Sequence, residues 1–278
     1  TSTTYYRVIV TSTLVASACT DTSNVITVTV YNVTASVVAG DQTVCSGDNP
    51  NPFTISTPAS GSGVLSYQWQ SATAVIGPWV NITSNGTNST YDPPSGITST
   101  TYYRVIVTST LGTSACTDTS NVITVTVNDV TASVVSGDQT VCSGDDPNAF
   151  TVSTLASGSG NLSYQWQSAT VVSGPWTNIT PNGTNSTYDP PSGITSTTYY
   201  RVIVTSTLGT SACTDTSNVI TVTINDVTAS VVAGDQTVCS GDDPNAFTVS
   251  TLASGSGNLS YQWQSATVVS GPWTNITP

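Results

Sequence analysis

Four residue types are missing from this 278-residue sequence: histidine, lysine, glutamate and methionine. All 15 acidic residues are therefore aspartates, and the three basic residues are arginines. General acid–base catalysis would depend on aspartate alone, and a cysteine nucleophile would have no histidine to activate it. We therefore predict that the chain is not an enzyme.

Positive charge is scarce, and the formal net charge is −12. Binding to nucleic acid or to an anionic membrane requires basic residues, so this charge argues against both partners. No apolar run approaches the roughly 20 residues of a membrane-spanning helix. The sequence opens on Thr-Ser-Thr-Thr-Tyr-Tyr and not on a signal peptide, which fits a mature or internal segment.

The sequence does contain a repeat with a period of 97 residues, which the cysteines Cys19, Cys116 and Cys213 mark. Segments 98–181 and 195–278 differ at only two positions. Apolar residues are mostly β-branched or aromatic and alternate with the two-residue period of a strand, not with the period of a helix. The period also matches the roughly 100 residues of an immunoglobulin sandwich. We predict an all-β chain of tandem immunoglobulin-like β-sandwich modules.

Within a module, one tryptophan and one tyrosine are expected at the centre of the core. Trp69 falls on the inward face of the third strand, in the position of the core tryptophan of immunoglobulin folds. Tyr103 starts a strand in which every second residue is apolar. The predicted core residues are Trp69, Tyr103, Trp166, Tyr200 and Trp263.

Other elements follow from local patterns. Residues 33–39 are expected to form the first strand, in which Val33, Ala35, Val37 and Ala39 alternate as the apolar positions. The Gly-, Asp-, Asn- and Pro-rich stretch 40–52 is expected to be a connection without a strand. A short strand is expected around Tyr91.

The repeat predicts two complete modules, 31–127 and 128–224. Residues 1–30 hold only the last two strands of a module (F and G), and residues 225–278 hold only the first ones (A to C′). Neither part can close a core alone, because each would leave an apolar face and an open edge. Placed tail to head they make one module that lacks only the 13-residue equivalent of 182–194.

Two interpretations of these partial modules stay open. The sequence is either a window of a longer tandem array, or a subunit whose tail completes the head of the next copy by strand addition. The missing connection favours the window, because a complementing subunit has no evident reason to lack it.

The motifs of the repeat resemble a known family, the bacterial Ig-like or PKD-like repeats of very large Bacteroidota surface proteins. These include gliding-motility adhesins exported by the type IX system. The resemblance implies a secreted or surface-attached protein of a Gram-negative bacterium. The motifs are Val-Cys-Ser-Gly-Asp (44–48), Tyr-Gln-Trp-Gln (67–70), Thr-Tyr-Tyr-Arg-Val (101–105), Cys116 and Ser-Asn-Val-Ile-Thr-Val-Thr-Val (120–127).

The six cysteines suit an oxidising compartment. Each module has one in its A–B connection and one in its F–G hairpin, at opposite ends and about 25–30 Å apart. A disulfide needs Cα atoms within about 7 Å, but the ends of neighbouring modules face each other. Three outcomes stay open: an inter-module Cys45–Cys213 bond, in-module Cys45–Cys116 and Cys142–Cys213 bonds, or free thiols.

Aspartates cluster in the A–B connection, where Asp138, Asp145 and Asp146 offer hard oxygen ligands that would suit Ca²⁺. The same residues are common in Asx turns on solvated loops, which is the interpretation we favour. The first module has Asn49 in the place of Asp146, which weakens the case for a metal. We predict no cofactor, with Ca²⁺ as the alternative.

A second tryptophan in each module, Trp79, Trp176 or Trp273, follows Gly-Pro. These residues would either cover the edge of the sheet or serve as exposed platforms for sugar rings. The Asp-Thr pairs that contain Thr22, Thr119 and Thr216 resemble the start of the Bacteroidota O-glycosylation signal, so these threonines are candidate O-glycosylation sites.

Two functions remain. The first is a structural segment of an extracellular fibre or cell-surface stalk, built from head-to-tail modules whose partners are copies of the chain or flanking identical modules. The second is an adhesin repeat that binds polysaccharide or surfaces through Trp79-type side chains. Near-identical repeats favour the fibre, because any ligand site would be repeated and generic. Both functions imply an extracellular or surface location.

Overall fold

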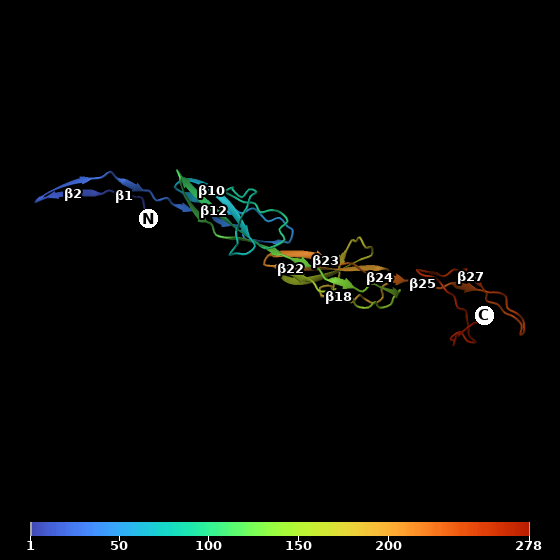
Figure 1. Cartoon of the computed structure of the whole chain (residues 1–278). Helices are drawn as coiled ribbons and strands as arrows, with labels where there is room; N and C mark the ends of the chain where they lie inside the picture. The colour runs from blue at the N-terminus through green and yellow to red at the C-terminus, as the bar shows by residue number, and fades with distance from the viewer. Residues whose placement is uncertain (1, 278) are drawn as a thin grey trace. The chain divides into compact units, whose positions relative to one another are not determined.

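The structure is a computed structural model that describes residues 2–277, and that range contains strands but no helix (Figure 1). It follows that no described helix is long and apolar enough to cross a membrane. The chain divides into two compact units. The first comprises Thr1–Asp129 with Thr207–Cys213, and the second comprises Val130–Ser206 with Thr214–Pro278.

We call residues 31–127 the first repeat, 128–224 the second repeat, 2–30 the head segment and 225–277 the tail segment. The strands of the first repeat are β5 (Val33–Thr34), β6 (Val37–Ala39), β7 (Gln42–Cys45), β8 (Thr54–Thr57), β9 (Ser60–Gly61), β10 (Val64–Ala72), β11 (Val80–Asn81), β12 (Thr101–Leu111), β13 (Ser114–Thr119) and β14 (Ile123–Asn128).

A mixed sheet with the order β11–β10–β12–β14–β7 forms one layer of the first repeat, and β13 also pairs with β12. Strand β12 pairs antiparallel with β10 from Tyr102 to Thr110. Strand β7 pairs parallel with β14, which places Cys45 opposite Asn128. The prediction of a strand-free connection at 40–52 was therefore wrong, because Gln42–Cys45 finds its partner in the last strand of the repeat.

The second layer consists of two short ladders, β6 with β8 and β5 with β9. In β6 the register shifts between Val37 and Val38. As a result Val38 is buried, whereas Val37 is 48% exposed and Ala39 also faces solvent. The predicted alternation was wrong here, since an irregularity in the ladder turns the strand by one residue.

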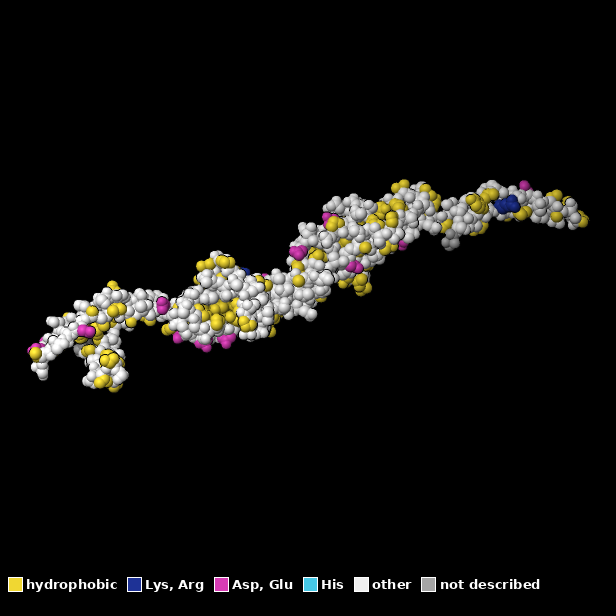
Figure 2. Space-filling view, turned by 180° about the vertical axis from the view of Figure 1, so that it is seen from behind, with side chains coloured by type: hydrophobic (Ala, Val, Ile, Leu, Met, Phe, Trp, Pro, Cys, Tyr) yellow, Lys and Arg dark blue, Asp and Glu magenta, His cyan; other side chains and the backbone are white. Residues whose placement is uncertain are grey.

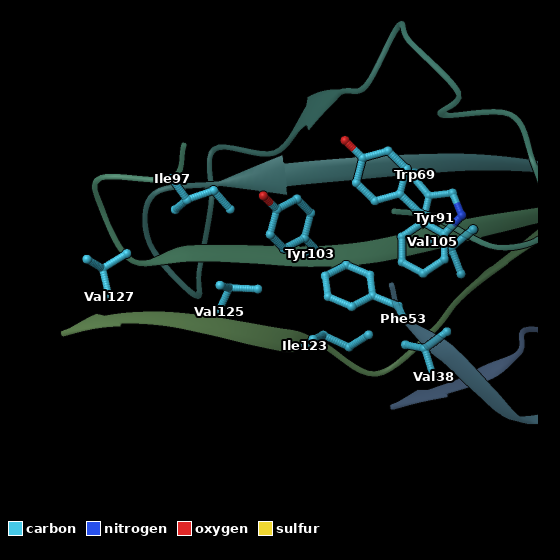
Figure 3. Packing of buried hydrophobic residues seen from close by; sticks show 10 residues of the cluster. All are labelled: Val38, Phe53, Trp69, Tyr91, Ile97, Tyr103, Val105, Ile123, Val125 and Val127. Atoms are coloured by element: carbon cyan, nitrogen blue, oxygen red, sulfur yellow. The ribbon is translucent and has the colours of Figure 1, made fainter. Parts of the chain in front are cut away.

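Between the layers lies an aromatic core, shown for the first repeat in Figure 3. Phe53, Trp69, Tyr91 and Tyr103 contact one another with ring centroids 5.1–6.2 Å apart. Such pairs contribute about 0.5–1.5 kcal/mol each beyond the area they bury. Trp69 is fully buried and Tyr103 nearly so, as predicted. The two layers and this core form an immunoglobulin-like β-sandwich.

Tyr91 belongs to this core without lying in a strand. Residues 82–100 contain no strand, so the short strand expected there does not form. Pro93 and Pro94 have no N–H group to donate to a ladder. The loop is fastened instead by single hydrogen bonds: Trp69 N–H donates to Gly86 O at 2.7 Å, and Phe53 N–H to Tyr91 O at 3.0 Å.

The second repeat has the same organisation, with Phe150, Trp166, Tyr188 and Tyr200 in its core. Its sheet has the order β17–β24–β22–β20–β21, with β23 paired to β22. Its strands are β15 (Val130–Thr131), β16 (Val134–Ser136), β17 (Gln139–Cys142), β18 (Thr151–Thr154), β19 (Ser157–Gly158), β20 (Asn161–Ala169), β21 (Thr177–Asn178), β22 (Thr198–Leu208), β23 (Ser211–Thr216) and β24 (Ile220–Asn225).

The head and tail segments form only small two-stranded ladders. The head strands are β1 (Thr4–Tyr6), β2 (Ile9–Leu14), β3 (Ser17–Thr22) and β4 (Ile26–Val28). The tail strands are β25 (Val227–Thr228), β26 (Val231–Ala233), β27 (Thr248–Thr251), β28 (Ser254–Gly255), β29 (Gln264–Ser265) and β30 (Thr274–Asn275).

Trp263, the third predicted core tryptophan, is 46% exposed, so its assignment to a core was wrong for this chain. Trp166 is its counterpart in the second repeat and is fully buried. The difference arises because the tail segment contains no equivalents of β22 and β24, the strands that supply Tyr200, Val202, Ile220 and Val222 to the core of the second repeat.

Candidate functional site

A disulfide between Cys45 and Cys213 is the main feature with functional meaning. Cys45 ends β7, and Cys213 lies in β23 close to the turn of the β22–β23 hairpin. Their Cα atoms are 5.5 Å apart, and the two residues are separated by 168 positions in the sequence. Because residues 207–213 belong to the first compact unit, the bond lies within that unit. It nevertheless joins the first repeat to a hairpin of the second.

The surroundings of the bond are buried and polar. Asn128, opposite Cys45 in the β7–β14 ladder, is fully buried, and its Nδ2 donates to Ser211 O at 3.2 Å. Ser46 N–H donates to Asn128 O at 3.3 Å. Cys213 is only 3% exposed. The tip of the hairpin therefore lies against the paired ends of β7 and β14, where Cys213 is buried and Cys45 is half-buried.

This bond is the inter-module pairing that the sequence left as one of three outcomes. The in-module pair Cys45–Cys116 is not formed, and the reason is distance. Cys45 lies opposite Asn128 near the Thr101 end of β12, whereas Cys116 pairs with Ser109 near the other end. Eight residues of strand span about 27 Å, far beyond the roughly 7 Å that a disulfide allows.

The in-module pair Cys142–Cys213 is likewise absent, since Cys213 is bonded to Cys45. Four cysteines carry free thiols. Cys19, Cys142 and Cys239 are exposed, and Cys116 is half-buried. Cys142 ends β17 opposite Asn225, in the same arrangement as Cys45 and Asn128. However, Asn225 is exposed where Asn128 is fully buried.

The aspartates proposed as calcium ligands take part in backbone hydrogen bonds. Asp138 Oδ1 accepts the N–H of Thr221 at 2.7 Å. Asp145 N–H donates to Cys142 O at 3.1 Å and closes the turn after β17. Asp146 is exposed on the same turn. In residues 2–277, no three His, Cys, Asp or Glu side chains lie close enough to hold a metal ion together. Neither hydrogen bond is an Asx turn, because Asp138 accepts from a residue of β24 and Asp145 uses its backbone N–H.

The second tryptophans of the two repeats stack on arginine. The guanidinium carbon of Arg104 lies 4.2 Å from the ring centre of Trp79, and that of Arg201 lies 4.3 Å from Trp176. Arg104 Nε also donates to Gln70 Oε1 at 2.8 Å. Trp79 and Trp176 are half-buried, whereas Trp273, in the tail segment, is 55% exposed. One face of each stacked ring is thus occupied within the repeat.

The candidate O-glycosylation sites Thr22, Thr119 and Thr216 are all exposed. The aspartate before Thr119 has a role that the sequence analysis missed. Asp118 Oδ2 accepts the N–H of Ala35 at 2.8 Å. Three residues later, Asn121 accepts the N–H of Val38 and donates to its carbonyl oxygen. This Asp-Asn clamp ties β6 to the β13–β14 connection. The Asp-Thr-Ser-Asn motif, which occurs in every copy of the repeat, is the sequence feature from which the clamp could have been predicted.

Burial raises the pKa of Tyr103 and Tyr200 to about 12, and the neighbouring Tyr91 and Tyr188 add to the rise. The neutral phenol is therefore favoured by folding. An unfolded tyrosine titrates at 10.0, so this stabilisation is complete below about pH 10 and is lost as the pH rises through about 12.

We expect the urea concentration at the midpoint of unfolding to decrease as the pH is raised from about 10 to about 12. The decrease should parallel the absorbance of the tyrosinates that form at the highest pH, those of Tyr103 and Tyr200. A chain with both Tyr103→Phe and Tyr200→Phe should show a shallower fall over the same range. If every tyrosine of the folded chain ionises near pH 10, this explanation is wrong.

Comparison with known proteins identifies the repeat. A family model described as "Domain of unknown function (DUF8696)" matches residues 34–129, 131–226 and 228–278. No curated protein matches the sequence significantly.

Among solved structures, three N-terminal domains of the Highly Immunogenic Outer Capsid protein (Hoc) of bacteriophage RB49 are similar at 12% identity. They cover 81% of this chain and 89% of theirs, with a TM-score of 0.40. A crystal structure of titin domains is similar at 17% identity, covering 80% of this chain and 75% of that one, with a TM-score of 0.34. The three matches of the family model span most of the sequence, so the chain belongs to the DUF8696 family.

Proposed function

We propose that this chain is a structural segment of an extracellular fibre or cell-surface stalk, in which consecutive immunoglobulin-like repeats are joined by disulfides. The observation that carries the proposal is the Cys45–Cys213 bond, which links one repeat to the hairpin of the next. A ligand-binding module has no need of such a bond. In an array under tension, however, it gives the force a covalent path around the folded cores.

An oxidising location supports the proposal. Disulfides persist outside the cytosol and are rare within it. The resemblance to surface-protein repeats of Bacteroidota leads to the same expectation, a secreted or surface-attached protein. The exposed threonines Thr22, Thr119 and Thr216 would be accessible to a glycosylating enzyme in that location.

The alternative function, an adhesin that binds polysaccharide, depends on Trp79 and Trp176 as sugar platforms. Both rings remain half-exposed, which keeps this function as a second candidate. A sugar would have to use the free ring face, because Arg104 and Arg201 occupy the other one. We therefore favour the structural function.

Antibodies raised against the purified chain test the proposal. Immunogold labelling of unbroken source cells should decorate filaments or stalks outside the cell envelope. Labelling that appears only after the cells are opened would contradict it. Saturable polysaccharide binding that is abolished by Trp176→Ala would favour the adhesin.

A further inference from the structure

The second repeat contains an open pocket of about 490 Å³ beside the strand-free stretch 179–197, and we call it the loop pocket. Its wall combines residues of this loop with Ser168, Asn178 and the buried Tyr200. All of them lie between residues 130 and 206, inside one compact unit. Small-molecule sites usually have volumes of about 300–1,000 Å³, so the loop pocket is large enough to be one.

Backbone hydrogen bonds fasten the loop to the sheet. Ile179 N–H donates to Trp166 O at 2.9 Å, and Trp166 N–H donates to Gly183 O at 2.6 Å. Phe150 N–H donates to Tyr188 O at 3.0 Å. A side chain in place of Gly183 would collide with the carbonyl oxygen of Ile179. The wall is therefore set before any ligand enters, and binding would not have to order the loop.

The hydroxyl of Tyr188 is a polar group that the fold leaves without a hydrogen bond. Tyr188 is 9% exposed, and its ring centre lies 5.6–6.2 Å from those of the other three aromatic rings of the core. The residue lines the loop pocket, and within residues 2–277 no hydrogen bond reaches its hydroxyl. Burial and the nearby charge of Asp189 raise the pKa of Tyr188, so the hydroxyl stays a neutral donor. Buried polar groups are normally hydrogen-bonded, which indicates a partner that enters from the pocket.

The rest of the wall mixes hydrogen-bonding and apolar groups. The amide of Asn182 and the carboxylate of Asp189 are exposed, and no hydrogen bond between described residues uses either side chain. Pro181 and Pro191 add apolar surface beside them. A ligand with hydroxyl groups on a carbon framework matches this wall, because its hydroxyls meet the polar groups while its carbons pack against the prolines.

Charged ligands fit the loop pocket less well. Asp189 is the one charged residue among the described residues of its wall, and Figure 2 shows aspartates with little arginine on the surface of both repeats. An anion would therefore meet like charge. A cation held by aromatic faces needs free rings, but the ring of Tyr188 is stacked on Trp166. Neutral sugars are the class of ligand that these groups suit.

We propose that the loop pocket binds a neutral sugar residue, whose hydroxyl groups form hydrogen bonds with Tyr188 and Asp189 and whose ring carbons pack against Pro181 and Pro191. This site goes beyond the structural function and does not depend on it, since a stalk can carry binding sites along its length. It also differs from the Trp176 platform, because Trp176 does not line the loop pocket.

The first repeat contains the same groups. Every residue of the wall recurs 97 positions earlier except Pro181, which is replaced by Ser84. In the first repeat the hydroxyls of Tyr91 and Tyr103 point to the same side, away from Val38 (Figure 3). We therefore expect a sugar site in each complete repeat, and the variants below change both repeats together.

Titration of the full chain with small ligands, followed by saturation-transfer difference NMR, tests the ligand class. The neutral probes are the methyl glycosides of glucose, galactose, mannose and N-acetylglucosamine, and the charged probes are glucuronate and spermidine. At least one neutral glycoside should bind saturably, and both charged probes should bind more weakly than it does. Tightest binding by a charged probe, or no binding by any neutral one, would overturn the proposal.

Removing the tyrosine hydroxyls tests the site without disturbing the core. A chain with Tyr91→Phe and Tyr188→Phe keeps both rings, so its urea midpoint should not fall. Its affinity for the sugar should fall about three- to tenfold, the usual effect of losing one hydrogen bond. The matched control is Tyr67→Phe with Tyr164→Phe, since Tyr164 does not line the loop pocket, and it should bind like the wild type. Equal affinities in the two variants would contradict the proposal.

The carboxylate is tested with a control of equal charge. Asp92→Asn with Asp189→Asn should weaken sugar binding by about tenfold, because hydrogen bonds to charged groups are stronger than those to neutral ones. Asp48→Asn with Asp145→Asn removes the same charge from exposed positions outside the wall and should change nothing. The same loss in both variants would mean that net charge, and not the loop pocket, controls binding.

A last variant separates the loop pocket from the tryptophan platforms. Trp79→Ala with Trp176→Ala should leave the affinity for the sugar unchanged. If this variant abolishes binding and the Tyr91 and Tyr188 substitutions have no effect, the sugar binds at the platforms and the proposal is wrong. None of these measurements uses the disulfide or the location of the protein, so their failure leaves the proposed structural function standing.

Discussion

Replacing Trp166 with alanine is expected to destabilise the second repeat by about 3–5 kcal/mol, the usual cost of removing a large buried aromatic side chain. Trp166 is fully buried and contacts Phe150 and Tyr188. Its indole Nε1 also donates to Asn185 O at 3.1 Å, so the truncation leaves an unpaired carbonyl as well as a cavity. In a urea titration, half of the β-sheet signal in circular dichroism should be lost at a lower urea concentration in the Trp166→Ala variant than in the wild type.

The chain supplies its own control for this prediction. Trp263 has the same sequence neighbours as Trp166 but is 46% exposed, and its one ring contact is with Phe247 at 6.0 Å. Trp263→Ala should cost about 1 kcal/mol or less, as for other exposed positions. Equal losses at the two positions would mean that the tail segment is folded like a complete repeat.

The two tryptophans also show how far the sequence can predict the fold. Periodicity identified the inward faces of β10 and β12 and of β20 and β22, and Trp69, Trp166, Tyr103 and Tyr200 are buried as predicted. Local pattern cannot show whether the covering strands are present, which is why Trp263 was assigned wrongly. Burial is a property of the assembled layers and not of the segment that carries the residue.

Long-range pairing explains the other misses. Strand β7 has only four residues, and its partner β14 lies about 80 positions further along the chain. The local sequence around Gln42–Cys45 therefore does not predict a strand. The shift in β6 at Val38 accompanies its pairing with β8 and its hydrogen bonds with Asn121, which lies 83 positions further along the chain. The cysteines could be limited to a few pairings, but the choice among them needed the position of β7.

The second large expectation concerns tension applied at the two ends of a single chain. Because Cys45 and Cys213 are bonded, force passes directly between them, and the 168-residue interval is shielded. Both aromatic cores lie inside this interval. The disulfide should therefore prevent this interval from contributing to the extension of the chain, a length of roughly 550–600 Å at about 3.3–3.6 Å per residue.

Reduction breaks the Cys45–Cys213 disulfide, so that the applied force acts on both repeats. Each repeat of 97 residues should then unfold separately and release up to roughly 320–350 Å. The double variant Cys45→Ser with Cys213→Ser should behave like the reduced chain without any reductant. Its cores are unchanged, so it separates the effect of the bond from any effect of the reducing agent.

Pulling single chains in optical tweezers, before and after addition of reductant, therefore tests the claim that a disulfide carries load around consecutive repeats. The claim predicts that the oxidised chain yields only the residues outside the Cys45–Cys213 interval, and that two additional unfolding steps appear on reduction. An oxidised chain that extends as far as the reduced one, through the same two steps, would contradict it.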